Sequence, residues 1–171
     1  KMGALKEGLT EEELPAIVRG WRKANPNIVS FWYALQKAAE RAIETGNRVY
    51  VHQVEVRGEY CAPDHGVYFH KRGPSLFFGM PSGRELVYCN VGIEDGEYGD
   101  RIIYWGVDQT KKRWSKLDTY SGKLAENLTQ SVARDLLMHG LQNLDRAGYK
   151  IVLHVHDEAV CEMPIGVGSL E

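Results

Sequence analysis

The sequence predicts an α+β fold in which a mostly antiparallel sheet packs against long helices. Three observations indicate this class. A helical period runs through residues 1–47, short runs of β-branched and aromatic residues occupy 48–118, and a second helical period followed by a hairpin pattern occupies 119–171. A chain of 171 residues is long enough for a domain with a real hydrophobic core. We expect these three segments to be its units of organisation.

The first segment predicts two helices. Thr10 and Glu13 have the spacing of a capping box, although Pro15 suggests that the helix begins a turn later. Asn25-Pro26-Asn27 ends this helix and starts the next, for which Gly46 is a credible C-terminal cap. In the second helix, apolar residues recur at intervals of mainly three and four: Ile28, Trp32, Leu35, Ala39, Ala42 and Ile43.

The middle segment predicts several short antiparallel strands. The runs RVYVHQVEV, GVYFH, LFF, ELVYCNV and RIIYW are separated by turn residues, among them Pro81-Ser82-Gly83 and Glu94-Asp95-Gly96. The basic run Lys111-Lys112-Arg113 is typical of a solvated turn, although a nearby phosphate would suit it. We interpret the four tryptophans as core or edge residues rather than a stacking platform: Trp21, Trp32, Trp105 and Trp114.

The last segment begins with a long helix from Ser121 to Arg146, with Gly148 as its stop. Its apolar stripe consists of Leu124, Leu128, Val132 and Leu136. Because Leu137 and Leu141 lie opposite that stripe, we expect the C-terminal half to be buried all round. Asp135 lies at the edge of the stripe, where a charge requires a partner.

A polar face lies opposite the apolar stripe. It consists of Lys123, Asn127, Gln130 and Arg134, which fall within a sector of ~60°. Amides reach base-edge acceptors in a minor groove and cations meet phosphates, so this face suits nucleic acid. An ordinary solvated helix face is the alternative.

The stretch IVLHVHDEAVCEMP predicts a hairpin, with strands at 151–155 and 159–163. Alternation places Val155 on the face opposite His154 and His156, and both Asp157 and Glu158 project from the tip. Adjacent carboxylates suit either a divalent cation or a hydrated turn. Oxygen ligands without clustered thiolates favour Mg²⁺ or Mn²⁺ over zinc.

The pair His154-x-His156 leaves a second metal hypothesis open. Two histidines at a strand end also resemble the transition-metal pair of amidohydrolases and cupins. Glu162 lies farther along than the cupin pattern requires, and no glycine-rich lead-in precedes the pair. Neither a GxxxxGK phosphate loop nor a GxSxG nucleophile elbow is present.

Composition further narrows the kind of protein that this chain can be. Hydrophobic residues make up 43% and charged residues 26%, as in ordinary globular proteins. The net charge of −2 gives no global signal for nucleic acid but is compatible with a local basic groove. Cys61, Cys89 and Cys161 are scattered, which favours a reducing compartment. No apolar run approaches the ~20 residues that span a bilayer, and no signal-peptide pattern is present, so we expect a cytoplasmic protein without a membrane partner.

The order of these features resembles one known family. TYSGKLAENLTQSVARDLLMHGLQNLDRAGYKIVLHVHDEAVCEMP is similar to the C-terminal palm of family A DNA polymerases, the DNA polymerase I group, and most similar to its phage branch. KANPNIVSFW and PSGRELVY resemble the same branch, and the resemblance covers nearly the whole chain. It implies that 1–47 is the end of the fingers, that 48–118 contains palm-region strands, and that 119–171 is the palm core.

The resemblance also implies roles for individual residues. Asp157 would coordinate the two Mg²⁺ ions of a two-metal mechanism, for which Mn²⁺ can substitute, with Glu158 as its supporting neighbour. His156 would approach the primer terminus, and Gln130 would contact the minor groove. Asn127 and Lys123 would fill the amide and basic roles on the same helix, and Arg134 completes the predicted DNA-binding set. Primer-template DNA and deoxynucleoside triphosphates would be the partners.

Two departures from the family pattern limit the expected activity. No DxSxxE-like strand motif supplies the second aspartate, and Lys1–Lys6 resembles only the end of the nucleotide-binding fingers helix. We therefore expect a piece of a longer polymerase, truncated at both ends and inactive by itself. A non-catalytic, polymerase-derived DNA-binding remnant is the alternative. Exposed sheet edges would favour self-association of such a fragment.

Overall fold

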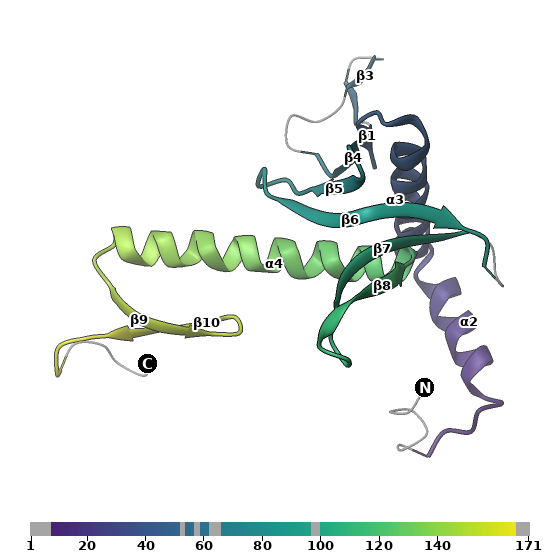
Figure 1. Cartoon of the computed structure of the whole chain (residues 1–171). Coiled ribbons are helices and arrows are strands. Elements are labelled where there is room, and N and C mark those ends of the chain that lie inside the picture. The colour runs from purple at the N-terminus through teal and green to yellow at the C-terminus, as the bar shows by residue number, and fades with distance from the viewer. Residues whose placement is uncertain (1–7, 52–53, 57–58, 62–65, 97–99, 167–171) are drawn as a thin grey trace.

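The computed structural model describes residues 8–51, 54–56, 59–61, 66–96 and 100–166 and confirms the α+β class. In Figure 1, two of the described helices approach the antiparallel sheet, and the first of the described helices extends away from it. The helices are α2 (Leu14–Ala24), α3 (Pro26–Thr45) and α4 (Ser121–Arg146). The strands are β1 (Val49–Tyr50), β2 (Val54–Val56), β3 (Glu59–Cys61), β4 (Tyr68–Arg72), β5 (Ser75–Gly79), β6 (Glu85–Glu94), β7 (Arg101–Asp108), β8 (Arg113–Thr119), β9 (Lys150–Val155) and β10 (Glu158–Glu162).

The predicted helix boundaries are confirmed. The backbone N–H and the hydroxyl of Thr10 both donate to Glu13 at 2.8 Å, and α2 begins at Leu14 with Pro15 in its first turn. Helix α3 ends before Gly46, which has a φ of 72° and donates its N–H to a carbonyl of the last turn at 3.0 Å. Glycine adopts this left-handed conformation without the steric cost that a side chain would impose.

The six-stranded sheet has the order β1-β4-β5-β6-β7-β8, and every neighbouring pair is antiparallel. Two further hairpins, β2-β3 and β9-β10, stand apart from it. Strand β8 was missing from the predicted runs, because RWSKLDT has few β-branched or aromatic residues. Its pairing with β7 makes it an edge of the described sheet. The self-association expected at such edges stays a prediction.

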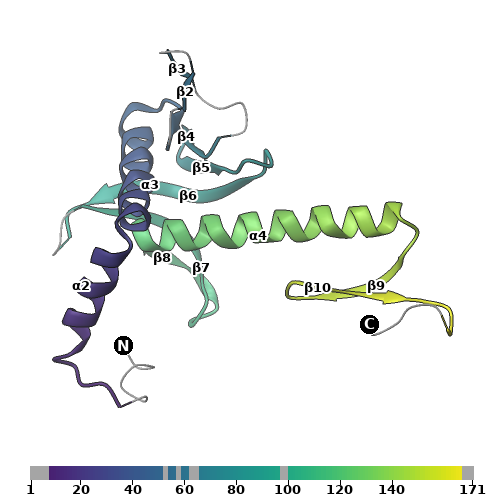
Figure 2. The ribbon, with the colours of Figure 1, turned by 180° about the vertical axis from the view of Figure 1, so that it is seen from behind.

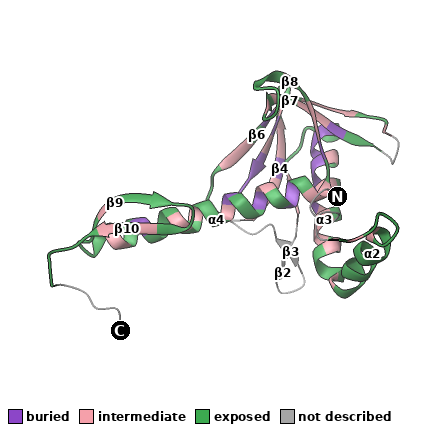
Figure 3. Cartoon of the chain, turned by 90° about the horizontal axis from the view of Figure 1, so that it is seen from below, coloured by how far each residue is buried: buried purple, intermediate pink, exposed green. Residues whose placement is uncertain are grey.

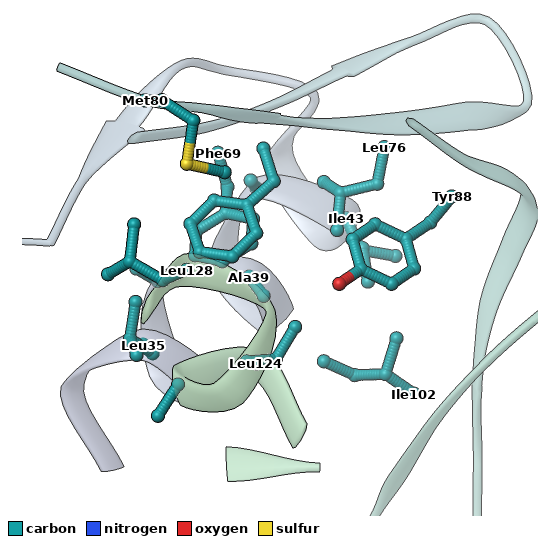
Figure 4. Close-up of a cluster of buried hydrophobic side chains, with 14 residues drawn as sticks. Leu35, Ala39, Ile43, Phe69, Leu76, Met80, Tyr88, Ile102, Leu124 and Leu128 are labelled. Atoms are coloured by element: carbon teal, nitrogen blue, oxygen red, sulfur yellow. The ribbon is translucent and has the colours of Figure 1, made fainter. Parts of the chain in front are cut away.

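The hydrophobic core lies between one face of the sheet and the helices α3 and α4 (Figure 4). The rings of Phe69 and Phe78 stack there with centroids 4.1 Å apart. Leu35 from α3 and Leu124 from α4 are fully buried against them. Each such side chain contributes ~1.5–3 kcal/mol by leaving water, so this cluster holds the first turns of α4 firmly on the sheet.

The C-terminal half of α4 extends beyond the sheet, with the β9-β10 hairpin beside it (Figure 2). The prediction that this half is buried all round was wrong. Leu136 is 67% exposed, and Met138 is 39% exposed, whereas Leu141 is buried. Figure 3 shows the contrast between the buried start of α4 and its exposed end. The apolar pattern therefore marks a surface that this chain leaves open.

The end of α4 follows the predicted stop. Gly148 has a φ of 86°, and its N–H donates to Asp145 at 2.9 Å. The N–H of Tyr149 donates to Leu144 at 3.0 Å. These paired bonds form a Schellman motif, which satisfies carbonyls of the last helical turn and turns the chain back toward β9.

The tryptophans were expected to be core or edge residues, and the structure bears this out only in part. Trp21 is 44% exposed and stacks on Trp32 with centroids 5.4 Å apart. Trp105 on β7 is 38% exposed and Trp114 on the edge strand β8 is 57% exposed. The edge assignment holds for Trp114, but none of the four is buried.

Candidate functional site

The β9-β10 hairpin closes through a two-residue loop, His156-Asp157. Glu158 is the first residue of β10 and pairs with Val155. The expectation that Asp157 and Glu158 both occupy the tip was therefore wrong. Only Asp157 lies in the loop, because Glu158 already belongs to strand β10. His156 has a φ of 51°, so it leaves the strand alternation that was predicted for it. Two-residue hairpin loops require positive φ because it matches the strand twist, and histidine is among the residues that tolerate it.

This loop faces α4 across a pocket of about 410 Å³. Four predicted site residues meet here: Gln130 and Arg134 from the helix, and His156 and Asp157 from the loop. Ala133 and Leu137 complete the lining. Residues 130, 134 and 137 share one helix face, because three and four residues make about one turn. The fold thus brings together two segments of the sequence, 130–137 and 156–157.

The polar groups of this pocket are open to a ligand. Gln130, Arg134, His156 and Asp157 are all exposed. Within the described residues, neither Arg134 nor Asp157 takes part in an ion pair. The pocket therefore combines a free carboxylate with amide and guanidinium donors, an arrangement suited to a cation together with an anionic or polar ligand.

Lys123 and Asn127 lie outside this pocket, so the predicted single donor surface is divided in two. Both line a second pocket of about 380 Å³ between α4 and the β7-β8 hairpin. Asn127 donates from Nδ2 to the Tyr88 hydroxyl at 2.7 Å, and Lys123 Nζ lies 3.5 Å from a carboxylate oxygen of Asp118. Burial raises the pKa of Tyr88 to about 12. Internal partners therefore occupy part of each side chain.

Asp135 has the partner that the sequence required. Its carboxylate accepts from Arg84 Nε at 2.7 Å and from Ser82 Oγ at 2.6 Å. Arg84 also donates to the Ser131 carbonyl at 2.9 Å. The bonds from Arg84 and Ser82 hold the pKa of Asp135 below its ordinary value. The β5-β6 turn thus fixes α4 at Ser131 and Asp135, the chain neighbours of the pocket residues Gln130 and Arg134.

The sequence analysis did not assign this role to Ser82 and Arg84. The signal was available, because the turn PSGR contains a hydroxyl and a guanidinium and Asp135 needed a partner. Pairing them required knowledge of which turn approaches the helix, and only the tertiary structure provides that.

The metal expected from the carboxylate turn can be tested against these side chains. Within the described residues, no group of three or more His, Cys, Asp or Glu side chains could hold a metal ion. Asp157 fits the role of one carboxylate ligand, since Mg²⁺ usually takes one or two protein carboxylates and completes its shell with water and phosphate. A transition-metal site built on His154 and His156 lacks a third ligand in the same part of the chain.

Comparisons with known proteins support the resemblance. The chain is 41% identical over 172 aligned residues to the DNA polymerase of Bacillus phage SP02. The alignment covers 100% of this chain and 25% of the relative, so the chain spans about a quarter of the length of that protein. No family model matches the chain, and no solved structure matches it. The similarity confirms the resemblance to a phage DNA polymerase that the sequence predicted.

Proposed function

We propose that this chain is part of a template-directed DNA polymerase of family A and supplies the helix and hairpin that hold the primer end. The observation that supports this most directly is the pocket that joins Gln130 and Arg134 of α4 to His156 and Asp157. All four were predicted site residues without knowledge of the fold: the helical period indicated Gln130 and Arg134, and the family resemblance implied roles for Gln130, His156 and Asp157. On this proposal, 1–47 ends the fingers, and 48–118 together with 119–171 belong to the palm.

The geometry suggests a distinct role for each side chain in the pocket. The amide of Gln130 donates to base-edge acceptors in the minor groove. One turn later, Arg134 pairs with a backbone phosphate. His156 lies in the two-residue loop, where it has a positive φ, and its side chain donates to the primer end. Lys123 and Asn127 continue the same helix face away from the loop, and we propose that they contact the DNA farther from the primer end through their remaining donors.

Asp157 is the proposed metal ligand. Its carboxylate lines the pocket, and Glu158 supports it from the first position of β10. Two Mg²⁺ ions, or Mn²⁺ in their place, would supply activation of the primer 3′-hydroxyl and stabilisation of the leaving pyrophosphate. Because Asp157 is the one carboxylate among the described residues that line the pocket, we propose that these 171 residues alone do not extend a primer.

The substrates on this proposal are primer-template DNA and deoxynucleoside triphosphates, and the setting is the cytoplasm of a bacterial or phage-infected cell. Within the described residues, no helix is both long enough and apolar enough to cross a membrane.

Primer extension tests the proposal in the longer protein to which this chain would belong. We expect extension with Mg²⁺ by the parent protein and a loss of about a thousandfold or more in Asp157→Asn, because a removed metal ligand affects the chemical step. Glu162→Gln is the matched control, since Glu162 lies at the opposite end of the same hairpin. Circular dichroism checks that each variant is folded.

The 171-residue chain permits a second test that does not depend on activity. Mn²⁺ added to the labelled protein should broaden the NMR signals of His156, and Asp157→Asn should abolish that broadening. A folded parent that extends no primer would favour the non-catalytic remnant. Equal activity of the parent and the Asp157→Asn variant would mean that the loop is a hydrated turn without a catalytic role.

A further inference from the structure

The β7-β8 hairpin presents an apolar face that the proposed primer site does not use. Ile102 and Thr119 pair across these strands and are buried toward the helices, so alternate residues point the other way. The outer face of the hairpin, defined by Trp105, Val107, Trp114 and Lys116, is therefore turned away from the core. Val107 is 51% exposed, Trp105 is 38% exposed and Trp114 is 57% exposed.

The two tryptophans are close enough to act together. Lys116 lies directly opposite Trp105, and Trp114 lies directly opposite Val107. Trp105 and Trp114 are therefore diagonal neighbours on one face, about 7–8 Å apart at the backbone and within reach of the same ligand. Neither ring stacks on another aromatic ring within the described residues, in contrast to the pair formed by Trp21 and Trp32.

The hairpin is basic although the chain is not. Between 101 and 119 it has five Lys or Arg residues and two aspartates, whereas the whole chain has a net charge of −2. The cations are Arg101, Lys111, Lys112, Arg113 and Lys116. The turn that joins the strands is exposed (Figure 3), and all five of these residues are exposed.

The nearby acids are already engaged. Asp108 accepts the backbone N–H groups of Thr110 and Lys111 at 2.8 and 2.9 Å, and these bonds lower its pKa. Glu94 accepts from Lys116, and Asp118 pairs with a lysine of α4.

Lys112 remains available at the tip. It has a φ of 51° at the exposed turn, and among the described residues it takes part in no ion pair. Exposed aromatic rings beside free cations are the combination that binds single-stranded nucleic acid, because the rings stack on bases while the cations meet phosphates.

We propose that the outer face of the β7-β8 hairpin binds single-stranded DNA, with Trp105 and Trp114 stacking on bases and Lys112 at the tip contacting a phosphate. The choice of a nucleic acid as occupant rests on the proposed polymerase function and on the charge of the hairpin. A second copy of the chain fits less well, because a two-fold interface across this face would bring two basic hairpins together.

Fluorescence anisotropy of a labelled oligo-dT of about 12 nucleotides tests this with the 171-residue chain. Metal and nucleotides are left out, so the result does not depend on primer extension. We expect the double variant Trp105→Ala/Trp114→Ala to bind about fivefold or more weakly. In Lys112→Gln, the slope of log affinity against log salt should fall by about 0.7, since each phosphate contact on a single strand contributes ~0.7.

Matched controls come from α3. Tyr33 is 50% exposed and Lys37 is exposed, so Tyr33→Ala and Lys37→Gln remove an aromatic ring and a cation from another surface and should leave the affinity unchanged. Circular dichroism and urea unfolding confirm that the hairpin variants are folded.

Three outcomes would overturn the proposal. The first is an affinity for oligo-dT that the hairpin variants do not change. The second is equal binding of poly-glutamate, which has charge but no bases and would assign the surface to acidic proteins. The third is dimerisation in sedimentation experiments that Trp105→Ala/Trp114→Ala abolishes, which would assign the face to a second copy. None of these outcomes affects the extension experiment with Asp157→Asn.

Discussion

The contact between the β5-β6 turn and α4 leads to a quantitative prediction. Replacing Asp135 with alanine removes two charge-assisted hydrogen bonds, those from Arg84 and Ser82. Bonds of this kind contribute ~1.5–3 kcal/mol each when buried, whereas exposed ion pairs contribute ~0.2–1 kcal/mol. The Arg84 side chain is 44% exposed and the Asp135 side chain 19% exposed, so the lower part of this range applies. We expect Asp135→Ala to lower the free energy of unfolding by about 1–2 kcal/mol.

A double-mutant cycle isolates the ion pair. With Arg84→Ala and Asp135→Ala, urea unfolding should give a coupling energy of about 0.5–1 kcal/mol. The exposed pair Lys150–Glu162 is the control, because its side chains are 73% and 59% exposed, and we expect a coupling below about 0.3 kcal/mol. Equal couplings for the two pairs would refute the reasoning that partial burial strengthens the contact with α4.

The same contact has a defined pH dependence. The pKa of Asp135 in the folded state lies below its ordinary value of 3.8. A carboxyl with a depressed folded pKa stabilises the protein fully above its unfolded pKa and loses that contribution as the pH falls through its folded pKa. The stability difference between the wild type and Asp135→Asn should therefore be constant near neutral pH and shrink below about pH 4. A difference that persists unchanged into strong acid would contradict the assignment of the charge to Asp135.

Three further predictions concern the core and α4. Leu124→Ala should cost about 2–5 kcal/mol in urea unfolding because Leu124 is fully buried, whereas Leu136→Ala on the exposed side of the same helix should change stability by less than about 0.5 kcal/mol. Gly140→Ala should stabilise by about 0.5–1 kcal/mol, because an added Cβ meets nothing within 4 Å in the helix, and Gly148→Ala should cost about 1 kcal/mol at its φ of +86°; thermal unfolding of the pair tests the opposite signs. The phenol of Tyr88 has a folded pKa of about 12, above the ordinary 10.0, so its contribution to stability is complete below pH 10 and is lost as the pH rises through 12. Tyr88→Phe should remove that part of the alkaline destabilisation, and ultraviolet titration of the tyrosines should lose one group with a high pKa.

Much of the local structure was predictable because its signals are local. Helix α4 begins and ends at the predicted residues, since the apolar period starts after Tyr120 and Gly148 terminates it. Glu13 accepts the backbone N–H of Thr10, which is half of the capping box that their spacing indicated, although the helix itself begins at Leu14. By contrast, β8 lacks a strong strand composition and forms because β7 provides a partner. A non-local partner of this kind leaves no mark within the run itself.

The candidate site was predictable in its residues but not in its grouping. Lys123, Asn127, Gln130 and Arg134 share a helix face, as the period indicated, but the structure divides them between two pockets. Their neighbours decide this division, because the β9-β10 loop approaches one end of the face and the β7-β8 hairpin approaches the other. Exposure was equally undetermined, since the apolar residues at the end of α4 follow the same pattern as the buried ones at its start.

The sequence by itself determined the order of the helices and of every strongly patterned strand, the chemistry of the loop residues and the resemblance to a polymerase. Propensity, capping and hydrophobic period depend on neighbours within a few residues, and a linear pattern records them. The tertiary structure alone decided that Arg84 and Ser82 meet Asp135, that Asp157 faces Gln130, and that the tryptophans of β7 and β8 remain exposed. These relations depend on which distant surfaces pack together, and packing depends on the shape and burial of the whole chain rather than on any single segment.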